Sequence, residues 1–483
     1  MMNNYEKYEA VIGLEVHAQL LTNTKAYSSD ENIYGATANT KTSVISLGHP
    51  GTLPRSNKKV IEYAVKLGIA VEANIREKNE YARKNYFYAD LPKGYQITQD
   101  TTPICSGGAI LITDKKGNTK EIAITRIHME EDAGKSIHDI DPFNTLIDLN
   151  RAGVPLLEIV SEPEIRSSDE AYQYINEVRK LVRYLDICDG NMEEGSLRCD
   201  ANISVRLKGD TEFGTKVEVK NMNSTRNVKK AIDFEIKRQI NLLESGQVIV
   251  HETRSFNAEK NTTISMRHKE EANDYRYFPE PDLQPVIVNS KYISDIKKKL
   301  PPLPKELHQK FTTQYGLSDY DVNILVNEKN IALYYNELCS FTKNYKGAAN
   351  FMNGIIKSHL NENAITISDF SISPERLASL ISIVDDGRVS NTVAISKIFP
   401  IMLISNESAD KIAIDNNWIQ ESNSKALENY IKIAIARYPD KVAEYKSGKT
   451  GLIGLFMGEI MKLSKGTADP KLANQILRTE LEK

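Results

Sequence analysis

The stretch AVIGLEVHAQLL, residues 10–21, sets the pattern for the first half of the chain. Apolar and polar side chains alternate along it, which is the period of a β-strand with one buried face. The side chains on its polar face are Glu15, His17 and Gln19. The stretch therefore predicts a sheet strand that turns a carboxylate and an imidazole in the same direction.

Two later segments, SLRCDANISVRL at 196–207 and TKVEVKNMN at 215–223, alternate in the same way. Such patterns are typical of antiparallel sheets with one face on the core and the other face polar. The polar positions mix charged groups with amides, a composition suited to recognition of phosphate, metal and amide groups. They are Arg198, Asp200, Asn202, Glu218, Lys220 and Asn221.

A β-hairpin is predicted over 111–129, and two helices interrupt the strands. Ser168 or Asp169 can cap the first helix. Ser224 can cap the second, with Gly246 as its C-terminal stop. The first part of the chain is therefore expected to mix strands and helices.

The amino-acid composition changes near residue 279, where the segments FPEPDLQP and KKLPPLPKEL are rich in proline. Proline-rich segments of this kind mark a boundary. Beyond Pro304 the periodicity is helical, with a second break near 403–410. At roughly 100–200 residues per domain, the chain should hold about three domains.

The bulk composition is that of an ordinary soluble protein. The chain has 483 residues and a formal net charge of −3, so any nucleic-acid binding must come from a local patch. Its four cysteines are scattered, and no segment resembles a signal peptide or a membrane span. We expect a cytoplasmic protein with no membrane segment.

The segment RIHMEEDAGKS, residues 126–136, concentrates ionisable side chains at the end of the predicted hairpin. If this strand lies beside the first one, Glu130, Glu131 and Asp132 join Glu15 and His17. Carboxylates with an imidazole suit Mg²⁺ or Mn²⁺ better than zinc. The competing interpretation is a solvated polar face of the sheet.

The pattern does not decide which of Glu130 and Glu131 faces His17. Ile122 and Ile124 imply one face of the strand for the core, whereas Ile127 and Met129 imply the other.

The motifs of phosphate loops and of self-sufficient hydrolases are missing. A phosphate loop needs glycine six residues before the lysine of a Gly-Lys-Ser/Thr sequence, but Met129 and Ala443 stand at those two positions. The chain also has no G-x-S-x-G motif, so a self-sufficient hydrolase or amidase is not expected.

Several long motifs occur in the order typical of one family. They include VIGLEVHAQL at 11–20, RKNYFYADLPKGYQI at 83–97, HMEEDAGKS at 128–136, DLNRAGVPLLEIVSEPEIRS at 148–167 and MEEGSLRCDANISVR at 192–206. On these motifs the whole chain closely resembles the B subunits of the aspartyl/glutamyl-tRNA(Asn/Gln) amidotransferases.

The resemblance implies an activity. Members use ATP and Mg²⁺ to phosphorylate the side-chain carboxylate of misacylated Glu-tRNA(Gln) or Asp-tRNA(Asn), and then amidate it with ammonia. The implied partners are the amidase, which is the A subunit, the small C subunit, and tRNA(Gln) or tRNA(Asn). The implied fold is α+β, with a kinase-like antiparallel-sheet cradle at 1–292, a helical linker domain at 293–405 and a helical tail at 406–483.

The resemblance also implies roles for single residues. The expected metal ligands are Glu15, His17, Glu130, Glu131 and Glu158. Lys84 is expected to act with Glu130 and Glu131 in catalysis, and Arg83 to join the six polar-face residues named above in binding nucleotide and substrate. The expected tRNA-elbow contacts in the tail are Lys446, Lys449, Lys462 and Lys465.

One departure from the family concerns zinc. Many members carry a zinc knuckle built from four cysteines, but the matching positions here are Ser28, Asp30, Ser43 and Ser46. Serine does not replace a thiolate ligand. We therefore expect no zinc at this site and a loop held by packing instead.

Two rival functions fit the same residues. One is a non-catalytic scaffold that binds tRNA while its partners perform all the chemistry. The other is a metal-dependent phosphotransferase that acts on a small molecule and turns over ATP without charged tRNA.

Overall fold

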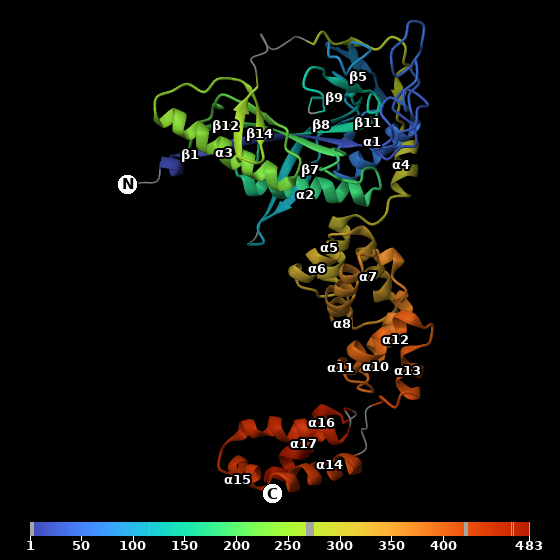
Figure 1. Ribbon diagram of the computed structural model, residues 1–483, viewed down its shortest axis with the longest axis vertical. Helices are drawn as coiled ribbons and strands as arrows, with labels where there is room; N and C mark the ends of the chain where they lie inside the picture. Colours follow the sequence, from blue (N-terminus) through green and yellow to red (C-terminus); the bar gives the residue numbers. More distant parts are fainter. Residues whose placement is uncertain are drawn as a thin grey trace. The chain divides into compact units, whose positions relative to one another are not determined.

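The computed structural model describes residues 4–114, 116–138, 140–266, 275–419, 424–464, 466 and 468–482. It divides the chain into two compact units, Met1–Leu303 and Pro304–Lys483. The first unit combines a large sheet with helices, and the second is helical (Figure 1). These features confirm the predicted α+β class and helical C-terminal part. The domain boundaries at 292 and 405, and the likeness to kinases, stay predictions.

A 10-stranded sheet forms the first unit. Most neighbouring strands are antiparallel, but β13 and β14 run parallel, so the sheet is mixed and not wholly antiparallel as predicted. From edge to edge the strands are β15 (Thr262–Ser265), β14 (Thr253–Asn257), β13 (Val217–Lys220), β12 (Leu197–Leu207), β1 (Tyr8–Gln19), β11 (Pro155–Ser161), β8 (Thr119–Glu131), β6 (Cys105–Ser106) and β2 (Asn74–Ile75), with β7 (Ala109–Thr113) paired to β8 off this path.

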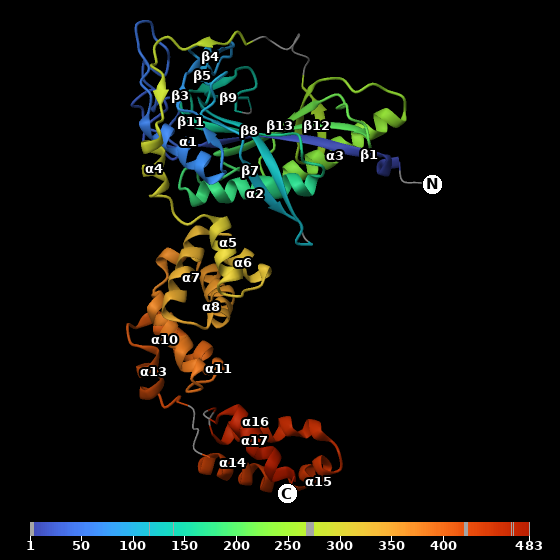
Figure 2. The same cartoon turned by 180° about the vertical axis from the view of Figure 1, so that it is seen from behind.

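One face of the sheet carries the hydrophobic core. Alternate residues of β1 from Ala10 to Ala18 are buried there, and so is Leu20 just after the strand, as the alternation predicts. The helices on this side are α1 (Lys58–Ala70), α2 (Ser168–Tyr184) and α3 (Thr225–Glu244), and α4 (Ser290–Lys297) packs on α1 (Figure 2). The polar residues of the same strands are therefore left on the opposite face.

The helix caps follow the predicted chemistry. The hydroxyl of Ser224 accepts a hydrogen bond from the Asn227 backbone at 3.1 Å, and Gly246 follows α3 with a φ of 72°. The cap of α2 is Ser167, one residue earlier than predicted, and it accepts from the Glu170 backbone at 3.2 Å.

A β-bulge interrupts the pairing of β8 with β11. Val160 lies opposite Arg126, but the next residue of β11, Ser161, lies opposite Ile124. Thr125 is therefore an extra residue in β8. An extra residue reverses which side chains face the core on either side of it.

The bulge answers the question that the sequence left open. Ile122 and Ile124 are buried on one side of it, and Ile127 and Met129 on the other, so both apolar pairs enter the core. Glu130 consequently lies on the polar face.

Smaller strand pairs flank the large sheet. A three-stranded sheet packs through β5 against β8. Its strands are β16 (Phe278–Pro279), β4 (Ala82–Asn85) and β5 (Tyr95–Thr98), and the remaining pairs are β9 (Lys135–Ile137) with β10 (Leu146–Asp148) and β3 (Lys78–Asn79) with β17 (Val286–Ile287). The loop at 83–97 is thereby placed near the end of β8.

The second unit is built from short helices. Its last four helices share a small apolar core that includes Leu427, Phe456 and Leu477. No helix in the described part of the chain is long and apolar enough to cross a membrane. The helices are α5 (Pro304–Thr313), α6 (Asp319–Leu325), α7 (Lys329–Phe341), α8 (Tyr345–Phe351), α9 (Lys357–Asn363), α10 (Pro374–Asp385), α11 (Asn391–Val393), α12 (Phe399–Ile404), α13 (Ala409–Asp415), α14 (Ser424–Arg437), α15 (Pro439–Lys446), α16 (Ile453–Leu463) and α17 (Pro470–Glu482).

Deleting Thr125 should strongly destabilise the first unit. Without the extra residue, one of the two apolar pairs must leave the core, and each such side chain contributes about 1.5–3 kcal/mol when buried. The midpoint of urea unfolding, followed by circular dichroism, should fall markedly. Thr125→Ser is the control, because it keeps the chain length and the hydroxyl that donates to Glu162 at 2.8 Å. Equal stability of the two variants would contradict this role of the bulge.

Candidate metal and nucleotide site

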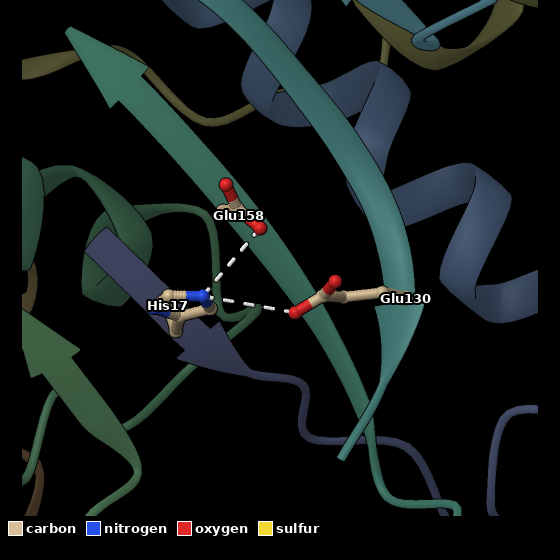
Figure 3. A group of neighbouring side chains, drawn as sticks. All are labelled: His17, Glu130 and Glu158. Carbon is tan, nitrogen blue, oxygen red and sulfur yellow. Dashed lines mark ion pairs between the residues drawn. The ribbon is translucent and has the colours of Figure 1, made fainter. Parts of the chain in front are cut away.

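Three side chains of the kinds that bind metal ions lie close together on the polar face, where β1, β11 and β8 are neighbouring strands. His17 is directly opposite Glu158, and Glu130 stands near the end of β8. His17 Nε2 is 3.5 Å from Glu158 Oε2 and 3.7 Å from Glu130 Oε1 (Figure 3). The ligand atoms of all three residues lie within 4.8 Å of one another. One cation could therefore contact all of them.

The two carboxylates of this group are buried, with 4% of Glu130 and 8% of Glu158 exposed. Burial and the charge of Glu158 raise the pKa of Glu130. Burial also opposes the charge on Glu158, but contacts with His128 and His17 outweigh it and hold the pKa of Glu158 well below its ordinary range. Two buried carboxylates so close together require nearby positive charge.

Two imidazoles can supply part of that charge when they are protonated. Burial disfavours their charged forms, yet contacts with Glu158 and Glu130 raise the pKa of both His17 and His128. His128 Nδ1 lies 2.9 Å from the Gln99 carbonyl oxygen. Its Nε2 lies 3.2 Å from Glu158 and is buried with no hydrogen-bond partner among the described residues.

His128 was not predicted as part of the site. Its position two residues before Glu130, on the same face of one strand, is the signal that could have identified it.

The residues present fit a hard divalent cation. Two carboxylate oxygens and an imidazole nitrogen are ligands that Mg²⁺ and Mn²⁺ accept. A cation there would neutralise the buried carboxylates and take the place of protons on the imidazoles, so its binding should be coupled to proton release.

Two predicted ligands, Glu131 and Glu15, do not enter this group. Glu131 forms an ion pair with Lys93 and accepts a hydrogen bond from the Ile97 backbone at 2.9 Å. Glu15 shares the face of His17, but its carboxylate accepts from the Asn202 amide at 2.8 Å. Lys93 was not predicted, and only its place in the motif RKNYFYADLPKGYQI could have indicated it.

Lys84 is brought near the carboxylates by β4. Burial disfavours its ammonium charge, but Glu130, Glu158 and two tyrosines together outweigh this effect and raise the pKa of Lys84. Its Nζ lies 4.8 Å from the centre of the Tyr275 ring. The neighbouring Arg83 instead donates hydrogen bonds to Glu280 at 2.7 and 3.0 Å, and to Asp282 at 3.0 Å.

The other predicted nucleotide and substrate residues form a row of paired charges along the polar face. Arg198 donates to Asp132 at 2.7 Å. Lys220 Nζ lies 2.6 Å from Asp200 and 2.8 Å from Glu218. This row runs across β12 to β13, away from the carboxylate group.

The two predicted amides lie beside this row. Asn202 binds Glu15 on the central strand, as described above. Asn221 follows β13 with a φ of 66°, and its amide donates to the Phe256 carbonyl oxygen at 3.4 Å.

The loop that holds the four cysteine-replacing residues is organised around Asp30. The Ser46 hydroxyl donates to Asp30 at 2.5 Å, and the Ser43 backbone donates at 2.8 Å. The hydroxyls of Ser28 and Ser46 are 3.0 Å apart. Burial opposes ionisation of Asp30, but these bonds and the charge of Lys25 lower its pKa. A hydrogen-bonded carboxylate therefore joins the loop, in addition to the predicted packing.

The predicted tRNA-binding lysines that the structure describes are Lys446 at the end of α15, Lys449 between α15 and α16, and Lys462 on α16. Lys446, Lys449 and Lys462 are exposed, and Lys449 pairs with Glu444 at 3.1 Å. Lys465 lies outside the described residues.

Mn²⁺ should bind to EDTA-treated protein at the group of His17, Glu130 and Glu158. Glu158→Gln should weaken this binding at least about tenfold, the smallest loss typical of disturbing a metal's surroundings. Isothermal titration calorimetry in two buffers would report both affinity and proton release. Glu121→Gln, an exposed change on β8, is the matched control. Unchanged Mn²⁺ affinity in Glu158→Gln would contradict the assignment.

Comparison with known proteins places these residues in a family context. Residues 10–294 match the model of the GatB/GatE catalytic domain, and residues 333–481 match that of the GatB domain.

Similar curated proteins cover the whole chain. The B subunit of the aspartyl/glutamyl-tRNA(Asn/Gln) amidotransferase of Pelodictyon phaeoclathratiforme is 48% identical over 476 residues, which span 99% of this chain and 100% of the relative. Proteins of the same name from Chlorobium limicola and Bdellovibrio bacteriovorus are each 47% identical over 476 residues. Those alignments cover 99% and 98% of this chain, and 100% and 99% of the relatives.

Proposed function

Because the chain belongs to the family of aspartyl/glutamyl-tRNA(Asn/Gln) amidotransferase B subunits, we propose that it amidates the side chain of an amino acid already attached to tRNA. Membership makes it one component of a glutamine-hydrolysing ligase of protein biosynthesis. The observation that carries the chemical part of the proposal is the buried group of His17, Glu130 and Glu158.

The reaction has two balanced steps. A side-chain carboxylate oxygen of Glu-tRNA(Gln) or Asp-tRNA(Asn) attacks the γ-phosphorus of ATP, and ADP leaves. Ammonia then attacks the acyl carbon, inorganic phosphate leaves, and the nitrogen loses a proton. The first step is needed because a carboxylate is a poor electrophile.

The first step joins two anions, so positive charge must be held where they meet. His17, Glu130 and Glu158 would hold Mg²⁺, which neutralises charge on the phosphoryl group when bound. Lys84, whose ammonium group interacts with Glu130, would supply a further cation for the substrate carboxylate. Arg198 and Lys220 provide further cations along the same face.

The polar face would then act as the cradle predicted from the sequence. The small sheet formed by β16, β4 and β5 packs against β8 and would limit access of water to the reacting carboxyl group. Exclusion of water protects an acyl phosphate from hydrolysis until ammonia arrives.

The chain has no G-x-S-x-G nucleophile motif for releasing ammonia from glutamine. We propose that a partner amidase, the A subunit, performs this hydrolysis and that the small C subunit joins the assembly. The helices α14–α17 would bind the elbow of tRNA(Gln) or tRNA(Asn) through exposed lysines.

Glu158→Gln should abolish ATP-dependent amidation of misacylated tRNA by the reconstituted complex while tRNA binding persists. The reason is that the carboxylate contacts both His17 and His128 and is needed to hold the cation. Conversion of Glu-tRNA(Gln) and of Asp-tRNA(Asn) would be measured separately, with Glu121→Gln as the control.

Turnover that survives in Glu158→Gln would favour the non-catalytic scaffold. ATP hydrolysis by the isolated chain at full rate without charged tRNA would favour the small-molecule phosphotransferase.

Reversing charge at Lys446 and Lys462 should weaken tRNA binding and make it less dependent on salt, since each lost phosphate contact removes one released counterion. Gel-shift titrations at two salt concentrations would show a slope of log K against log[salt] reduced by roughly one per lost contact. Lys357→Glu, an exposed change on α9, is the matched control. An unchanged slope in the double variant would remove these lysines from the tRNA contact.

A further inference from the structure

A row of four tyrosine rings joins two segments that are far apart in the sequence. One segment directly follows β4, and the other directly precedes β16. The centres of successive rings are 5.7, 5.9 and 6.4 Å apart, and each ring meets the next edge to face. In order along this tyrosine row, the rings are those of Tyr88, Tyr86, Tyr275 and Tyr277.

The backbone holds the two segments against each other. The Asn85 backbone N–H donates to the Tyr275 carbonyl oxygen at 2.9 Å, and the Asn85 side-chain amide donates to the Arg276 carbonyl oxygen at 2.8 Å. Arg276 has a φ of 44°, a left-handed conformation that persists in a non-glycine residue only where the surrounding structure enforces it. The place of the Tyr275 ring is therefore set by β4 and not by burial in the core.

The rings of the tyrosine row are partly open to solvent. The exposed fractions are 48% for Tyr88, 41% for Tyr275 and 40% for Tyr277. Single exposed aromatic residues are common on protein surfaces, but neighbouring ones form an apolar patch of the kind that marks a binding site. A ligand with flat apolar faces would cover such rings.

The Tyr277 end of the row lies near the ligand group formed by His17, Glu130 and Glu158. Burial raises the pKa of Tyr277, and the charge of Lys84 opposes that rise. The charges of the two glutamates raise the pKa of Tyr277 further. The Tyr277 hydroxyl is thus within electrostatic range of both carboxylates of the ligand group.

Lys84 connects the row to the same group. Its Nζ lies 4.8 Å from the centre of the Tyr275 ring and 5.9 Å from that of Tyr86. Ammonium groups at such distances are attracted to the face of an aromatic ring. Lys84 also interacts with Glu130, so the row and the ligand group share one cation.

The chemistry of the substrate places RNA at this end of the row. The carboxyl group to be amidated is joined to the terminal ribose of the tRNA by only a few covalent bonds. When that carboxyl group lies at the ligand group, the last nucleotides must lie next to it. These nucleotides are unpaired, and proteins hold unpaired bases chiefly by stacking them on aromatic rings.

We propose that the tyrosine row stacks the unpaired nucleotides at the 3′ end of the tRNA and so places the attached amino acid at the ligand group. The proposal rests on the proposed function, because it takes an aminoacyl-tRNA as the substrate. It assigns a specificity site for RNA beside β4 and β16, separate from the lysines expected to contact the tRNA elbow.

Stacking depends on the face of a ring and not on its hydroxyl group. Tyr275→Phe should therefore bind tRNA like the native protein. Tyr275→Leu keeps an apolar side chain but lacks the ring, so it should bind more weakly. The comparison separates stacking from hydrogen bonding and from the burial of apolar surface alone.

The test uses the full-length protein and two kinds of probe at one fixed salt concentration. The first is a transcript of tRNA(Gln) or tRNA(Asn) with its complete 3′ end, and the second is the same transcript without its last three nucleotides. Fluorescence anisotropy measures the affinity of Tyr275→Leu, Tyr277→Leu and Tyr275→Phe for each probe.

Phe213→Leu is the matched control, because it also removes an aromatic ring from the surface of the first unit. The Phe213 side chain is 62% exposed and lies between β12 and β13. It follows Leu207 at the end of β12, whereas Arg198, near the other end, is paired with His17. At 3.3 Å per residue, these two ends of β12 are roughly 30 Å apart.

We expect Tyr275→Leu and Tyr277→Leu to weaken binding of the complete transcript about fivefold or more, the loss typical of removing one stacked base. Binding of the shortened transcript should not change, and Tyr275→Phe and Phe213→Leu should bind both probes like the native protein. The midpoint of urea unfolding, followed by circular dichroism, checks the fold. If both leucine variants are destabilised, Tyr88→Leu at the other end of the row takes their place.

Two results would overturn the proposal and leave the proposed function standing. One is equal affinity of the native protein for the complete and the shortened transcript, and the other is an equal loss of both in the leucine variants. Weaker ATP binding with unchanged tRNA binding would also overturn it, because the rings would then hold a free nucleotide. If the native protein binds neither transcript, the proposed function itself fails.

Discussion

The burial of Glu130 beside Glu158 is the constraint around which the first unit is arranged. Each carboxylate disfavours the charge of the other, and neither has enough solvent to screen it. His17, His128 and Lys84 reach the pair from three different strands and supply compensating charge. Burying such a cluster costs desolvation free energy and does little to stabilise the fold. Buried ionisable groups with shifted pKa values are concentrated at functional sites.

That arrangement depends on the pairing of β1 with β11 and on the β-bulge in β8. β1 and β11 set His17 directly against Glu158, and the extra residue Thr125 turns Glu130 to the same side. Because Glu131 then lies on the other side, it meets Lys93 and the backbone of β5. The two adjacent glutamates thus have different environments. Glu130 lies in the ligand group, and Glu131 joins β5 to the end of β8.

Much of this fold was predictable from local pattern, because alternation fixes which side chains of β1 and β12 face the core and hydroxyl caps fix where α3 begins. The choice between Glu130 and Glu131 was not, since a bulge is set by the pairing of β8 with β11, far away in sequence. The parallel pairing of β13 with β14 has the same origin: α3 lies between them along the chain, and no residue pattern reports their direction. His128 was missed because a strand histidine on its own does not reveal which carboxylate will stand opposite it.

The loop around Asp30 is held by hydrogen bonds between side chains and backbone. Oxygen and nitrogen groups cross-link it, and none of Ser28, Asp30, Ser43 and Ser46 carries a thiol that peroxide could oxidise. The four cysteines of the chain lie buried elsewhere. The shape of this loop would therefore not depend on keeping a thiol reduced.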